Sequence, residues 1–171
     1  YNSNIIKNVS NCLNKNEDFL HGNLIYHKDS MINRIWKFSI KTLNHYNTCK
    51  IAHPTLVVKT TLLKKIKYNE KYKISSDTDF LIRLLKIKNL KYKKLDKYLI
   101  YMSSGGLSTS FQNSLLKIKE DIAIYINHFR YLGIFIYFYK PLIKLNGFLI
   151  NKNKKNKLRF NLIKELKILQ K

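Results

Sequence analysis

Acidic residues are scarce in this chain, which has 10 Asp and Glu against 33 Lys and Arg in 171 residues. The net charge of +23 attracts polyanions such as nucleic acid, an anionic membrane face or phosphate-bearing substrates. The excess is almost all Lys, and it is accompanied by Asn, Ile and Tyr, whose codons are rich in A and T. A bias in base composition explains the same charge without a selected partner, so charge alone does not choose a function.

Glycine, proline and cysteine are also few, at 5, 2 and 2 residues. The low Gly and Pro counts exclude a collagen-like or Pro/Gly-rich disordered chain, while 45% hydrophobic residues are enough for the core of one domain. Cys12 and Cys49 have neither CxxC nor metal-ligand spacing, so a reducing compartment is expected. The longest apolar run, over 131–139, is shorter than the roughly 20 residues that span a bilayer.

Several catalytic signatures are missing from the sequence. It has no Walker A motif, no GxGxxG motif, no GxSxG elbow and no zinc-type spacing of His or Cys. These absences leave the function to weaker local signals.

Hydrophobic periodicity predicts a mixed α/β chain. Strands are expected over 19–26, 32–38, 55–59 and, as one or two strands, 90–102. Helices are expected over 4–15, 77–86 and 110–128, and a short helix capped by Thr60 or Thr61 is expected through Ile66. So few strands are unlike a closed α/β sheet, and the pattern favours one side of a larger sheet.

Two of the few acids, Asp77 and Asp79, lie where a polar loop meets the helix expected over 77–86. In one interpretation Asp77 caps the helix and Asp79 complements its dipole. In the other, a carboxylate fixed at the end of an element is a general base that takes a proton from a hydroxyl. The sequence leaves both interpretations open.

Two further small motifs stand near predicted element ends. His53–Pro54–Thr55 precedes the strand expected over 55–59, where Pro fits a strand entrance. Gly105–Gly106 lies in the segment SSGGLS and ends the preceding strand. Each motif is explained equally by local structure or by contact with a substrate.

Taken in order, four motifs resemble glycosyltransferase family 2, in its bacterial surface-polysaccharide branch. They are HGN at 21–23, HPT at 53–55, ISSDTDFLIRL at 74–84 and GGLS at 105–108, against YGD, HPT or HQ, SADYDFLLRL and GGxS in the family. The likeness covers roughly residues 15–128. Asn23 stands where the family has an acid, and Thr78 stands where it has an aromatic residue between the two Asp.

The resemblance implies an inverting transferase that moves a sugar from a nucleotide diphosphate sugar to a hydroxyl of a polysaccharide or lipid-linked acceptor. By position, Asp77 would be the catalytic base. Asp79 and Arg83 would support the geometry of the site, and His53, Gly105 and Gly106 would line the acceptor and donor-phosphate side.

The resemblance also implies a GT-A type sheet of which this chain is the acceptor-side, C-terminal portion. Residues 1–130 would belong to the catalytic domain, and 131–171 would form an aromatic, Lys-rich helical extension. The Asp-x-Asp motif that holds Mg or Mn on the donor diphosphate is not in the sequence, so metal ligands are expected upstream of Tyr1. The chain alone is therefore predicted to be inactive.

The basic, aromatic tail suits a cytoplasmic location on the inner face of the cell membrane, although a packed helix with a solvated end explains it equally well. The alternative function is a non-catalytic basic protein that binds an anionic membrane or nucleic acid. Because Lys is spread through every segment and no RNP-type signature occurs, no specific nucleic-acid partner is expected.

Overall fold

A computed structural model describes residues 9–10, 16–28, 31–38, 43–103 and 111–145 of the chain. Most of the predicted helix over 4–15 lies outside these residues. Only residues 9–10 of it are described, and they are helical. Gly105 and Gly106 also lie outside them. Within the described residues the protein is mixed α/β, as predicted.

A small mixed sheet is built around β1 (Phe19–Lys28). On one edge β1 pairs antiparallel with β2 (Met31–Trp36) and with the two-residue β3 (Val57–Val58). On the other it pairs parallel with β4 (Tyr92–Ser103) along most of its length. A parallel neighbour requires a crossover, and the helices between β3 and β4 supply it.

The β1–β4 pairing is irregular on both sides of Asn23. A Cβ on the preceding residue, Gly22, would lie 2.5 Å from Leu99 Cγ and 3.1 Å from the Lys97 carbonyl oxygen. Gly22 therefore allows the two backbones to approach closely, as expected for a glycine inside a strand.

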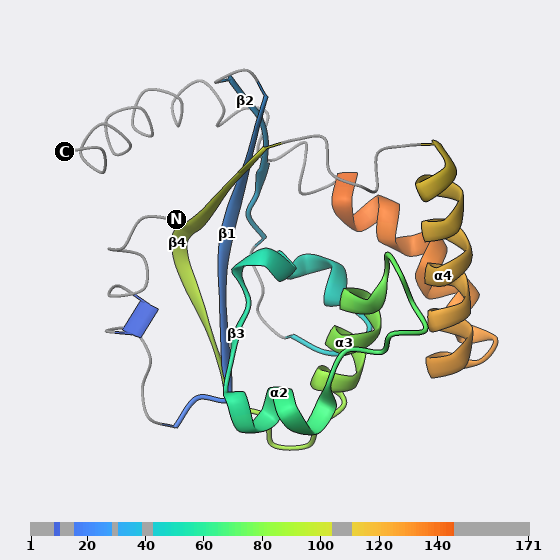
Figure 1. Cartoon of the computed structure of the whole chain (residues 1–171), viewed down its shortest axis with the longest axis horizontal. Helices are drawn as coiled ribbons and strands as arrows, with labels where there is room; N and C mark the ends of the chain where they lie inside the picture. The colour runs from blue at the N-terminus through green and yellow to red at the C-terminus, as the bar shows by residue number, and fades with distance from the viewer. Residues whose placement is uncertain (1–8, 11–15, 29–30, 39–42, 104–110, 146–171) are drawn as a thin grey trace.

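The helices are α2 (Thr60–Ile66), α3 (Ser76–Leu85) and α4 (Phe111–Phe129), followed by helical residues over 132–145. In Figure 1, α3, α4 and the orange residues 132–145 lie on one side of the sheet. The predicted helices over 60–66, 77–86 and 110–128 are thus confirmed to within a residue at either end.

Two details of the prediction around α2 are wrong. His53–Thr55 forms a 3-10 turn (η2) instead of entering a strand, and the strand expected over 55–59 is reduced to β3. Thr60 is the first residue of α2, and its N-cap is Lys59, which makes no side-chain cap bond. The turn replaces the strand because the Thr55 hydroxyl is hydrogen-bonded to Gly22 and so holds η2 against β1.

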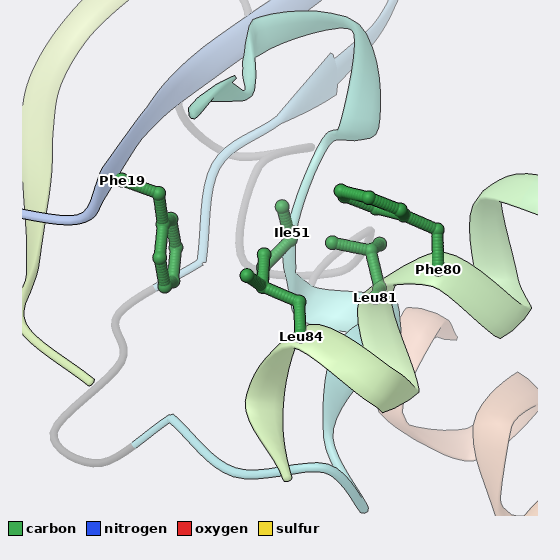
Figure 2. Packing of buried hydrophobic residues seen from close by; sticks show 5 residues of the cluster. All are labelled: Phe19, Ile51, Phe80, Leu81 and Leu84. Atoms are coloured by element: carbon green, nitrogen blue, oxygen red, sulfur yellow. The ribbon is translucent and has the colours of Figure 1, made fainter. Parts of the chain in front are cut away.

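The core divides on the two faces of the sheet. On the helical side, Phe19 packs with Ile51 and with Phe80, Leu81 and Leu84 of α3 (Figure 2). On the other side, Leu20 packs with Leu95 and Leu99 of β4 and with Val9. Successive residues of β1 face opposite sides, as strand geometry requires, and α3 is anchored against the sheet by its apolar face.

Candidate functional site

The first turn of α3 brings together two motifs that are distant in the sequence. His53 Nδ1 in η2 lies 2.9 Å from Asp77 Oδ2 in α3. The His53 side chain is 52% exposed and that of Asp77 is 26% exposed. The pair is therefore open to a substrate on the His53 side, while Asp77 is partly shielded.

Thr55 anchors the η2 turn that carries His53. The Gly22 N–H donates to Thr55 Oγ1 at 3.0 Å, and the same hydroxyl lies 2.8 Å from the Ala52 carbonyl oxygen and 3.1 Å from that of Gly22. Thr55 is buried. Two predicted motifs, HGN and HPT, thus meet through a hydroxyl that neither spacing nor composition singled out.

Asp77 does not cap α3, and the capping interpretation is wrong in that form. The N-cap position belongs to Ser75, which makes no side-chain cap bond. Asp77 instead accepts a hydrogen bond from the Thr78 N–H (2.8 Å) through Oδ1, and the same N–H also donates to the Ser75 carbonyl oxygen at 3.0 Å. Its other oxygen remains for His53.

The surroundings of Asp77 keep it charged. Burial alone would raise the pKa of this carboxyl, but the hydrogen bond and charge of His53, together with Lys117 and the Thr78 N–H, outweigh burial and hold the pKa below its ordinary value. A carboxylate that is ionised at neutral pH and partly accessible can accept a proton.

Asp79 has a different environment on the same turn. Its carboxylate is buried and binds Arg83 Nη2 at 2.7 Å and Arg83 Nε at 2.8 Å through one oxygen, and His128 Nε2 of α4 at 2.8 Å through the other. Arg83 also donates to the carbonyl oxygens of Ile66 and Lys67 at the end of α2. Asp79 and Arg83 therefore join α2, α3 and α4, and these contacts leave them little capacity to bind a substrate.

Glu120 of α4 was not recognised from the sequence. Its carboxylate accepts the backbone N–H groups of Lys73, Ile74 and Ser75 at 2.8–2.9 Å. Burial would raise its pKa, but these three bonds hold it below the ordinary value. Glu120 thus orders the loop that enters α3. No short-range pattern could have revealed this, because the loop and Glu120 lie far apart in the chain.

Two tyrosines near Asp77 were also missed. Burial raises the pKa values of Tyr26 in β1 and Tyr68 in the loop before α3, and the Asp77 carboxylate raises both further. Tyr26 also lies beneath the guanidinium of Arg34, at 5.5 Å from its ring centre. The phenol groups of Tyr26 and Tyr68 thus lie within electrostatic reach of Asp77.

Within the part of the chain that the structure describes, no three His, Cys, Asp or Glu side chains come together as ligands for a metal ion. The described residues therefore do not fit the divalent cation of the resembled family. Ligands upstream of Tyr1 stay a prediction.

Comparison with models of known protein families, with curated proteins and with solved structures finds no match to this chain. The geometry of the His53–Asp77 pair and the motifs that carry it are therefore the features of this chain that bear on function.

Proposed function

We propose that this chain is the acceptor-side part of an inverting glycosyltransferase of the GT-A type, similar to family 2. It would take part in transferring a sugar from a nucleotide diphosphate sugar to a hydroxyl of a polysaccharide or lipid-linked acceptor at the cytoplasmic face of the membrane. The observation that carries the proposal is the 2.9 Å contact between His53 and Asp77, which joins two motifs of the resemblance in space.

The chemistry assigned to Asp77 follows from its environment. In the proposed step the acceptor oxygen attacks the anomeric carbon and forms the new C–O bond. The C–O bond to the diphosphate breaks, and the nucleoside diphosphate leaves with the bonding electrons. The hydroxyl proton passes to Asp77, which is ionised and partly accessible before the reaction.

The remaining predicted residues take supporting roles in this proposal. His53 orients the Asp77 carboxylate and faces the acceptor, since more than half of its side chain is exposed. Asp79 and Arg83 hold α3 against its neighbours. Gly105 and Gly106 lie outside the described residues, and their role on the donor-phosphate side stays a prediction. No step is assigned to a metal here.

The proposal is tested in two stages. The first is to sequence the DNA upstream of the Tyr1 codon, where the proposal expects an open frame with strand–helix alternation and an Asp-x-Asp motif. The second is to assay sugar transfer by the product of that frame, with Asp77→Asn beside wild type. We expect Asp77→Asn to lose about 10²–10⁴-fold in rate, the contribution of a general base.

Glu70→Gln is the matched control, because Glu70 is an exposed acid in the loop before α3. It should transfer sugar at the wild-type rate. Full activity of Asp77→Asn would remove the catalytic role of this carboxylate, and a frame without a donor site would favour the non-catalytic alternative.

A further inference from the structure

The helical residues over 132–145 are arranged with their charged side chains inward. Lys140 is buried, with Nζ 3.3 Å from Asp121 Oδ2 and 4.6 Å from the ring centre of Tyr125. Lys144 Nζ lies 5.4 Å from the ring centre of Trp36, and burial lowers the pKa of this lysine. The two lysines of this helix therefore face the protein.

The inner face also holds a close helix–helix contact. A Cβ on Gly133 would lie 2.1 Å from the Tyr125 carbonyl oxygen of α4. Ile136 and Tyr137 pack against the cluster of Ile82, Ile124 and Tyr125. These contacts fix which side of the helix points outward.

The outward side carries an apolar stripe, which we call the outer stripe: Tyr131, Phe135, Phe138, Leu142 and Leu145. The spacing is four, three, four and three residues, so the four members within the helix share one face, and Tyr131 lies in the turn just before it. Tyr131 is 85% exposed, Phe135 73% and Phe138 67%. An ordinary surface helix turns its apolar face toward the core and polar residues outward, whereas this helix carries large apolar side chains on its outward side as well.

The charge of the segment that follows the outer stripe in the sequence indicates what kind of surface the stripe contacts. Residues 146–171, which follow the stripe in the sequence, include eight Lys and Arg and one acid, Glu165. A basic segment that follows an exposed face of aromatic and aliphatic residues in the sequence complements a lipid surface with anionic headgroups. Tyr and Phe rings suit the boundary between headgroups and acyl chains.

We propose that the outer stripe is a membrane-docking surface, which lies in the interface of an anionic bilayer and does not cross it. None of the helices that the structure describes combines the length and apolarity of a membrane span. The proposal goes beyond the transferase function and does not depend on it, because docking needs neither a donor nor Asp77.

The test is sedimentation of the full chain with vesicles of phosphatidylcholine alone and of phosphatidylcholine mixed with phosphatidylglycerol. Wild type should bind the anionic vesicles more strongly, and added salt should weaken binding. Phe135→Ser/Phe138→Ser should lower partitioning by about tenfold for each ring removed. The control Val57→Ser/Leu63→Ser removes two exposed apolar side chains from β3 and α2 and should bind like wild type.

A second measurement reports where the stripe lies. Phe135→Trp on a Trp36→Phe background leaves one tryptophan, since the chain has a single Trp. Its fluorescence should shift to the blue with anionic vesicles and be quenched by brominated lipid. This readout remains informative if the serine variant does not fold.

Three results would overturn the proposal. One is absence of vesicle binding by wild type, and another is equal binding by the stripe variant and the control. The third is self-association of wild type that Phe135→Ser/Phe138→Ser abolishes without changing vesicle binding, which would make the stripe a contact between copies. None of these outcomes bears on sugar transfer, so failure here is distinguishable from failure of the proposed function.

Discussion

Asp77 and Asp79 lie two residues apart on the first turn of α3, yet they face two different regions of the molecule. On the η2 side, Asp77 meets a half-exposed histidine and retains access to solvent. On the α4 side, Asp79 is buried and has Arg83 and His128 as partners. The Asp79 region holds three helices together, while the Asp77 region keeps a charged, partly accessible oxygen that the fold itself does not require.

The burial and the partners of a carboxylate separate structural from functional acids in a chain that has few of them. A carboxylate that is itself buried and has both oxygens bound contributes to stability, and its removal leaves its charged partners uncompensated. A carboxylate whose main partner is exposed contributes little to stability. Its position is then better explained by what it can bind or deprotonate.

The largest expected effect is a difference in stability between the two acids. Asp79→Ala should lower the free energy of unfolding by about 3–5 kcal/mol, because Arg83 and His128 would be left without their partner. Asp77→Ala should cost about 1 kcal/mol or less, since its ion pair is exposed. Urea unfolding at neutral pH measures the free energy of unfolding of both variants. Equal losses would mean that the two acids do not differ in their contribution to stability.

A smaller effect on stability is expected at Glu120, which orders the loop over 73–75 just before the first turn of α3. Glu120→Ala should lower the free energy of unfolding by about 2 kcal/mol, because three backbone N–H groups would lose their acceptor. Urea unfolding measures the loss, and Glu70→Ala, which removes an exposed acid before the same loop, should leave stability near wild type. A Glu120→Ala variant as stable as that control would show that the loop does not depend on Glu120.

The smallest expected effect is electrostatic and sharpens the assignment of Asp77. His53→Ala removes the main partner that opposes burial, so the pKa of Asp77 should rise. The pKa of the native carboxyl is lowered, so its contribution to stability is present above the ordinary pKa of an Asp and is lost as pH falls through the folded pKa. In His53→Ala that contribution should be lost at a higher pH.

Carbon-detected NMR titration of the Asp77 carboxyl measures this shift. Asp18 is the internal control, because its lowered pKa has separate causes, chiefly the hydrogen bond from the Lys91 N–H. An unchanged Asp77 titration in His53→Ala would mean that the 2.9 Å contact does not govern the charge of this carboxylate.

Much of the secondary structure was predictable because its signals are local. The apolar spacing in α3 and α4 and the β-rich run of β1 indicated their elements within a few residues. The turn at His53–Thr55 was not, since it depends on a hydrogen bond between Thr55 and Gly22 of a distant strand. The face of α4 could not be chosen either: Leu115, Ile118 and Ile126, which share one face by spacing, are exposed, while Ile124 and Tyr125 are buried.

The candidate site shows the same division. By itself, the sequence determined that the chain is mixed α/β, that its few acids include two at the start of one helix, and that an aromatic, basic segment follows the last predicted helix. Periodicity and composition are properties of neighbouring residues, so a sequence expresses them directly. Only the tertiary structure decided that Asp77 meets His53 and that both oxygens of Asp79 are bound by Arg83 and His128. It also decided that the helix over 132–145 turns its lysines inward. Those outcomes depend on which distant segments pack together, and packing is a property of the whole chain.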